Sequence, residues 1–313
     1  MKTNHVSKLW FDEVSYWEET EILFRYQPST RKQQVTERSQ VLIIENLPTL
    51  CQLAWNKVKE MLGDYYITAT HLVKPAQIID DSCQVYTTVV DAFANYDSPA
   101  RLSVILGQNL VTIRQKYSSE DARVLGFVAM QFYHVSQNIS GCLSPQERLL
   151  FEPYLQVVDD YLYLPVGDLH NLIMGYSKNS PILLAVEKLL QQMNSISLAI
   201  YHRVSELNPN YHSKSGSLKD SRIKDSSMRD IELFLSYICL CVLTGSISPV
   251  EEELLPLCAM LYPKLGVSWK LIQDLLLVLF WEVSARLNDQ DITIFLPYFR
   301  TINKIFSEEI LTS

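Results

Sequence analysis

The sequence predicts an all-α fold, built from two related helical-bundle units with an additional N-terminal helical region. Apolar residues recur at helical spacing nearly everywhere after residue 45. Only nine glycines occur in 313 residues, which favours long regular elements over tight turns. The stretches SGCLSPQERLL (residues 140–150) and TGSISPVEEELL (residues 244–255) repeat nearly the same signals for the end of one helix and the start of the next. With 48% hydrophobic and 20% charged residues, the composition is typical of a globular protein.

The first 95 residues form the N-terminal helical region of this prediction. An aromatic helix begins it, with Trp10, Phe11, Val14 and Trp17 spaced for one face. We expect this face to pack on the rest of the chain rather than on a membrane. Charges recur every few residues near the N-terminus, so we expect no signal peptide and no export. The polar residues 25–40 form a soft boundary after this helix.

Serine–proline pairs mark the starts of the later helices. Serine caps a free backbone N–H, and the missing N–H of proline costs nothing in the first helical turn. The pairs predict helices that begin at four positions: Pro99, Pro145, Pro181 and Pro249.

The repeated stretches carry a capping box. Glu147 follows Ser144 by three positions, as Glu251 follows Ser248, so each carboxylate reaches back to its serine N–H. Apolar residues then occupy equivalent offsets on one helical face, which predicts that both helices bury the same side. The equivalent pairs are Leu150 with Leu254, Tyr154 with Cys258, Val157 with Leu261, and Val158 with Tyr262.

The surroundings of the two stretches also correspond. An apolar helix precedes each one and ends at a glycine suited to a left-handed C-cap, Gly141 or Gly245. Another helix follows each one, with Asp168 or Ser268 as its capping residue. We therefore expect a duplicated helix–turn–helix–cap–helix unit.

The duplication sets the predicted domain boundaries. The first helical unit covers residues 96–205 and the second covers residues 231–313. Residues 206–230 are rich in Ser, Lys and Asp, which predicts a polar linker or loop.

An apolar helix, a glycine turn, the pattern [LI]-S-x-x-E and an amphipathic helix ending in LGVSWKLIQDLL resemble the TerB-like family. That family is named for a tellurite-resistance protein and occurs in some membrane-associated co-chaperones. The second copy, residues 231–310, resembles it better than the first, residues 121–205. The resemblance implies a helical module in stress handling. The family has an aspartate before the turn glycine, where this chain has Ser140 and Thr244, so only Glu147 and Glu251 remain of its acidic set.

No residue set predicts catalysis. We interpret Glu147 and Glu251 as helix-capping residues in preference to metal ligands. Asp168 and His170 form the only close acid–imidazole pair near a helix start, and we interpret them as a cap and a partly exposed side chain. These four residues are the weak metal candidates, and no cofactor is predicted. The sequence favours a non-enzymatic role.

The six cysteines predict a reducing compartment, and hence a cytoplasmic location. They form no CxxC pair, and each lies among apolar neighbours as reduced core cysteines do. Cys239 and Cys241 lie two apart on a helix, where side chains point to nearly opposite sides, so they cannot chelate one ion. We interpret them as packing residues.

The leading functional hypothesis is a non-enzymatic interaction or assembly module with a protein partner. A net charge of −8 opposes binding to nucleic acid, so a transcriptional regulator is the weakest alternative. Basic residues in segment 206–230 leave contact with an anionic membrane surface as a minority interpretation. The main alternative is a helical protein or enzyme that holds a haem, pigment or metal between helices, through His134, His170 or the tyrosines.

Overall fold

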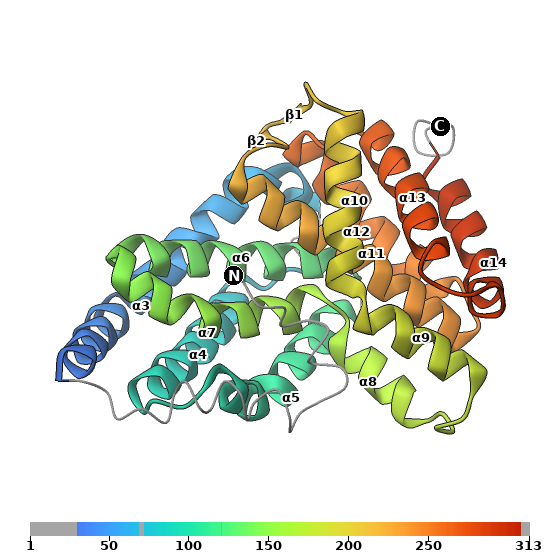
Figure 1. Cartoon of the computed structure of the whole chain (residues 1–313). Helices are drawn as coiled ribbons and strands as arrows, with labels where there is room; N and C mark the ends of the chain where they lie inside the picture. The colour runs from blue at the N-terminus through green and yellow to red at the C-terminus, as the bar shows by residue number, and fades with distance from the viewer. Residues whose placement is uncertain (1–29, 69–71, 120, 308–313) are drawn as a thin grey trace. The chain divides into compact units, whose positions relative to one another are not determined.

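The structure, a computed structural model, describes residues 30–68, 72–119 and 121–307. Nearly all described elements are helices, which confirms the predicted all-α fold (Figure 1). The chain divides into two compact units with their boundary between Tyr163 and Leu164. We call residues 30–163 the N-terminal unit and residues 164–307 the C-terminal unit. The predicted helix around Trp10 lies outside the described residues.

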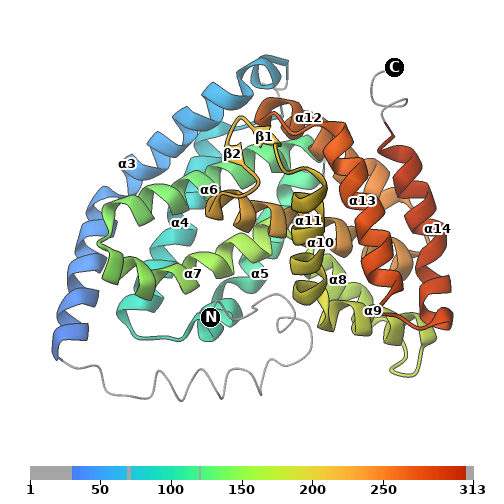
Figure 2. The same ribbon diagram turned by 45° about the horizontal axis from the view of Figure 1, so that its top comes forward.

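Five helices build the N-terminal unit. The long helix α3 packs along α6 and α4, and α5 packs on α7 (Figures 1 and 2). The bounds are α3 (Thr30–Thr68), α4 (Pro75–Ala94), α5 (Pro99–Ser118), α6 (Arg123–Cys142) and α7 (Pro145–Tyr163).

An aromatic cluster forms the core between α4 and α7. The ring of Phe93 on α4 meets Phe151 edge-on at 4.9 Å and Tyr154 at 5.3 Å between centroids. The hydroxyl of Tyr154 donates to the backbone oxygen of Asp97 at 2.6 Å, so this buried polar group has a partner. The cluster therefore fixes α4 against α7.

The C-terminal unit surrounds the apolar helix α11. This helix packs against α8, α9, α10 and α14, and its residues 231–243 are all buried. No helix among the described residues is long and apolar enough to cross a membrane. The elements are α8 (Val166–Met174), α9 (Pro181–Gln191), α10 (Met193–Leu207), β1 (His212–Ser213), β2 (Gly216–Ser217), α11 (Ser221–Thr244), the π-helical turn η1 (Val250–Leu254), α12 (Leu255–Leu265), α13 (Trp269–Ser284) and α14 (Asp289–Ile305).

Residues 206–230 differ from the polar linker that the sequence predicts. They contain the end of α10, the β1–β2 hairpin and the first ten residues of α11. Lys214 N donates to Leu265 O at 3.0 Å, and Tyr211 Oη donates to Gly266 O at 3.0 Å. These partners lie about fifty residues away in the sequence, so the polar composition of the segment gave no sign of them. The predicted boundaries at residues 95 and 205 fall inside the two units rather than between them.

Three of the four serine–proline pairs begin helices as predicted. Helices α5, α7 and α9 start at their prolines, and Ser98 Oγ accepts from Arg101 N at 3.1 Å. The capping box at Ser144 is also confirmed, because Ser144 N donates to Glu147 Oε2 at 2.8 Å and Glu147 N donates to Ser144 Oγ at 3.4 Å.

The second repeated stretch folds differently. Gly245 adopts the predicted left-handed cap with φ +67°, but Ser248 N then donates to Ser246 Oγ at 3.1 Å and not to Glu251. The chain continues into the π-helical turn η1. Pro256, just beyond this turn, has no N–H to donate to the Glu252 carbonyl, and such a missing bond favours a local change of helical register.

Two other caps of the predicted duplication are wrong. Gly141 lies inside α6 without a positive φ, and Asp168 lies within the first turn of α8 rather than before it. Ser268 does cap α13, accepting from Leu271 N at 3.3 Å.

The two glutamates of the repeat give a matched test of capping. Replacing Glu147 with alanine is expected to lower the free energy of unfolding by about 1–2 kcal/mol, because the Ser144 N–H loses its acceptor and the buried side chain of Glu147 is removed. Replacing the exposed Glu251 is expected to change it by less than about 0.5 kcal/mol. Urea denaturation of both variants measures the difference, and equal losses would contradict this assignment.

Candidate ligand pocket and its cysteine pair

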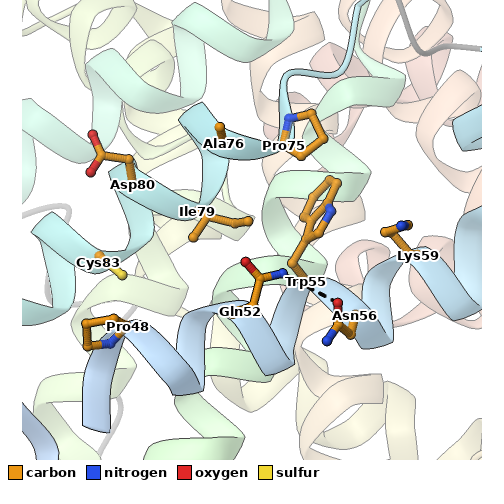
Figure 3. A pocket seen from close by; sticks show the side chains of 10 residues that line it. All are labelled: Pro48, Gln52, Trp55, Asn56, Lys59, Pro75, Ala76, Ile79, Asp80 and Cys83. Atoms are coloured by element: carbon orange, nitrogen blue, oxygen red, sulfur yellow. Dashed lines mark hydrogen bonds between the residues drawn. The ribbon is translucent and has the colours of Figure 1, made fainter. Parts of the chain in front are cut away.

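A pocket of about 610 Å³ opens between α3 and α4 of the N-terminal unit. This volume lies within the range of small-molecule sites. Figure 3 shows the side chains that line it. They are Pro48, Gln52, Trp55, Asn56 and Lys59 from α3, and Pro75, Ala76, Ile79, Asp80 and Cys83 from α4.

Helical spacing brings the pocket residues together. Positions 48, 52, 55 and 59 share one face of α3, and positions 76, 79, 80 and 83 share one face of α4. Trp55 is buried, with its ring 6.5 Å from Phe127 of α6, so it gives the pocket an aromatic wall. Gln52 Nε2 donates to Asn56 Oδ1 at 3.4 Å, and both side chains are exposed. The pocket thus combines an apolar wall with a polar rim.

Cys83 brings a reactive group to this pocket. Its side chain is half-buried and lies within hydrogen-bonding reach of the fully buried Cys51 of α3. A hydrogen bond with Cys51 lowers the pKa of Cys83, while burial and the nearby Asp80 carboxylate oppose the shift. The same hydrogen bond, followed by burial, raises the pKa of Cys51. Cys83 is therefore the member of the pair that favours the nucleophilic thiolate.

A buried amide holds the cysteine pair in place. Gln131 of α6 donates through Nε2 to the backbone oxygen of Cys51 at 3.0 Å and to Ser82 Oγ at 3.1 Å. Ser82 Oγ in turn donates to Ile79 O at 2.7 Å. Because Gln131 is fully buried, it fixes α3 and α4 next to both cysteines.

The structure does not bring the four predicted metal candidates into one site. Glu147 belongs to the N-terminal unit and is held by Ser144, with Arg38 Nε 3.7 Å from its other oxygen. Glu251 is exposed in η1, whereas Asp168 and His170 lie in α8 with His170 exposed. Over the described ranges, no group of three or more His, Cys, Asp or Glu side chains is arranged to hold a metal ion.

His134, named in the alternative hypothesis, lies partly buried in α6. Its Nε2 atom has no hydrogen-bond partner. Burial and, to a smaller extent, the positive charge of Lys57 lower its pKa to about 4. The imidazole is therefore neutral at physiological pH, and it does not line the α3–α4 pocket.

The remaining cysteines divide into two kinds. Cys239, Cys241 and Cys258 are buried, which confirms Cys239 and Cys241 as packing residues. Burial raises the pKa of each of these thiols, for Cys241 to about 12. Cys142 is exposed, so the prediction that all six are core cysteines is wrong for it and for the half-buried Cys83.

Comparison with known proteins adds one finding. Residues 156–305 match the family model of phycobilisome proteins. The match covers 150 of 313 residues, from within α7 to the end of α14. No curated protein and no solved structure matches the chain.

This match corrects several expectations. The segment that resembles the TerB-like family best lies inside the matched range, so the TerB-like assignment and the stress-handling role are wrong. Phycobilisome proteins carry covalently attached bilin chromophores, and the prediction of no cofactor is therefore also wrong. The match favours the alternative hypothesis of a helical cofactor-binding protein over the interaction module.

The cysteines of the matched range do not fit a covalently held pigment. Cys239, Cys241 and Cys258 are 0%, 0% and 2% exposed, so no large ligand reaches their sulfurs without disrupting the core. The α3–α4 pocket does fit such a group, because it combines an accessible thiol, an aromatic wall, a carboxylate and a lysine. Cys83 thus offers a thiol that lines a cavity of ligand size.

Proposed function

We propose that this chain is a helical pigment-binding protein that holds a linear tetrapyrrole of the bilin type in the α3–α4 pocket. The observation that carries the proposal is the phycobilisome family match of residues 156–305. The location rests on the pocket chemistry, since Cys83 is accessible and its pKa is lowered. A bilin supplies an extended conjugated system that absorbs visible light.

Four pocket residues would hold this group. The Cys83 thiolate would bind it covalently through sulfur. The Asp80 carboxylate would accept hydrogen bonds from pyrrole N–H groups, and Trp55 offers an aromatic surface for contact with the rings. Lys59, at the exposed edge of the pocket, would pair with the acidic side groups of the pigment.

Under this proposal the chain works with protein partners in the cytoplasm. Phycobilisome proteins assemble into oligomeric complexes, which supports a role in an assembly. Helix α13 adds support, because Leu277 and Trp281 lie four residues apart on it and are 54% and 63% exposed. Recovery of the chain only as a free monomer from its native extract would count against this part.

Attachment of pigment to Cys83 can be tested by producing the chain in cells that make a bilin. We expect the wild-type chain to keep visible colour after denaturation and to fluoresce on a zinc-treated denaturing gel. Cys83→Ser is expected to lose at least ten-fold of this signal, because the thiol of the pocket is gone. The control Cys142→Ser removes an exposed thiol outside the pocket and should keep the signal.

A titration separates binding from attachment. Adding free bilin to purified Cys83→Ser should still shift the pigment absorption and quench Trp55 fluorescence, since the pocket remains. A Cys83→Ser chain as strongly coloured after denaturation as the wild type would refute the site. Failure of the wild type both to take up colour and to bind free bilin would refute the function.

A further inference from the structure

The contact between Cys51 and Cys83 joins residues that are 32 positions apart in the sequence (83 minus 51). Cys51 lies on α3 and Cys83 on α4, and their thiols are hydrogen-bonded. The buried Gln131 bridges the Cys51 carbonyl and Ser82, the residue before Cys83. Cys83 also lines the pocket together with Pro48 and Gln52, which lie three residues before and one residue after Cys51 on α3. The two cysteines therefore lie on facing turns of packed helices, as a disulfide between them requires.

The two thiols differ in how they can react. Cys83 lines the pocket and can be reached from solvent, whereas Cys51 is fully buried. A small oxidant therefore meets Cys83 first, and Cys51 is the neighbour in place to react second. A reactive, accessible cysteine beside a second cysteine is the usual arrangement of a redox-sensing pair.

We propose that Cys51 and Cys83 form a reversible disulfide that closes the thiol site of the α3–α4 pocket under peroxide. The Cys83 thiolate attacks one oxygen of hydrogen peroxide and breaks the O–O bond, leaving a sulfenic acid and, after proton uptake, water. The sulfur of Cys51 then attacks the sulfur of Cys83, forming the S–S bond and releasing a second water. Both sulfurs are oxidised, and the two peroxide oxygens are reduced.

The disulfide would act on the pocket in two ways. It would join α3 to α4 covalently, and it would remove the Cys83 thiolate from the pocket. The consequence for pigment attachment rests on the proposed function, whereas formation of the bond does not. Reduced chain would accept a pigment, oxidised chain would not, and a dithiol reductant would restore acceptance.

Other cysteine pairings are less favourable. Cys239 and Cys241 are both fully buried, two apart on α11, where side chains diverge. Cys142 is exposed and would form disulfides between chains instead. The Cys51–Cys83 pair differs from these because its two side chains interact and one of them can be reached from solvent.

Peptide mapping of the full-length, pigment-free chain tests the disulfide. The reduced protein is treated with hydrogen peroxide, free thiols are blocked by alkylation, and the chain is cleaved with trypsin, which cuts after Lys and Arg but not at the Lys74–Pro75 bond. We expect residues 39–57, which contain Cys51, to be joined to residues 60–101, which contain Cys83. Alkylatable thiols should fall from six to four per denatured chain and return to six after reduction.

Two variants sharpen this test. In Cys51→Ser, Cys83 should not be joined to another peptide and should accumulate sulfinic and sulfonic acid. Cys142→Ser should form the disulfide as the wild type does. Joining of Cys83 to Cys142 of another chain, or oxidation of Cys142 without the 39–57 to 60–101 product, would overturn the proposal.

Pigment loading distinguishes the two proposals. If reduced and oxidised chain accept pigment equally although the disulfide forms, regulation of the pocket fails while the pigment site stands. If the reduced chain accepts none and the disulfide forms, the proposed function fails while the redox pair stands.

Discussion

Replacing Phe151 with alanine is expected to lower the free energy of unfolding of the N-terminal unit by about 3–5 kcal/mol. Phe151 is fully buried and lies in the aromatic cluster with Phe93 and Tyr154. Its removal takes apolar surface out of the core and leaves a cavity where α4 packs on α7. Because α4 carries Cys83, the change should also weaken ligand binding in the α3–α4 pocket. Urea denaturation followed by circular dichroism measures the loss.

A neighbouring residue serves as the control for this prediction. Leu149 lies two positions earlier on the same helix, but its side chain is 73% exposed. Leu149→Ala should therefore change the free energy of unfolding by no more than about 0.5 kcal/mol. Similar losses in the two variants would contradict the packing described for α7.

Replacing Glu232 with glutamine is expected to stabilise the C-terminal unit by about 3 kcal/mol above pH 8. Glu232 lies on the buried side of α11, next to Ile231 and Leu233. Burial raises the pKa of its carboxyl from 4.5 to about 7, although the positive charge of Arg229 opposes the shift. Glutamine keeps nearly the same shape and removes the ionisation that the core disfavours.

The pH dependence of this effect has a definite direction. Because the folded-state pKa lies above the unfolded one, the protonated carboxyl is favoured in the fold, and its contribution to stability is complete below pH 4.5. That contribution is lost as the pH rises toward and through 7. The gain from Glu232→Gln should therefore be near zero at pH 4 and reach its full value above pH 8. A gain that is the same at both pH values would contradict the burial assigned to Glu232.

Local signals in the sequence predicted most helix starts, because their causes are local. Ser98 and Ser144 accept hydrogen bonds from backbone groups three residues on, so their role can be read from a short stretch. The stretch at Ser248 looks alike but folds differently, since Ser246 accepts its N–H and Pro256 lies close behind. The residues on either side of the capping motif thus determine whether the capping box forms, and the motif alone does not include them.

Contacts between distant segments escaped prediction. The hairpin at residues 212–217 is polar, and Lys214 within it and Tyr211 beside it bond to residues 265 and 266, which lie far away in the sequence. The pocket was missed for the same reason, since Cys51 and Cys83 look like ordinary core cysteines among apolar neighbours. One signal was present: positions 48, 52, 55 and 59 share a helical face, as do 76, 79, 80 and 83. Nothing in the sequence says that these two faces meet.

The location of the pigment on the chain distinguishes attachment at Cys83 from attachment at the buried cysteines of the C-terminal unit. The chain loaded with bilin is cleaved with trypsin, which cuts after Lys and Arg but not before proline, and mass spectrometry identifies the peptide that carries the adduct. We expect the adduct on residues 60–101, in which Cys83 is the sole cysteine. An adduct on residues 230–264, which hold Cys239, Cys241 and Cys258, or no adduct on any peptide of a chain exposed to bilin, would contradict it.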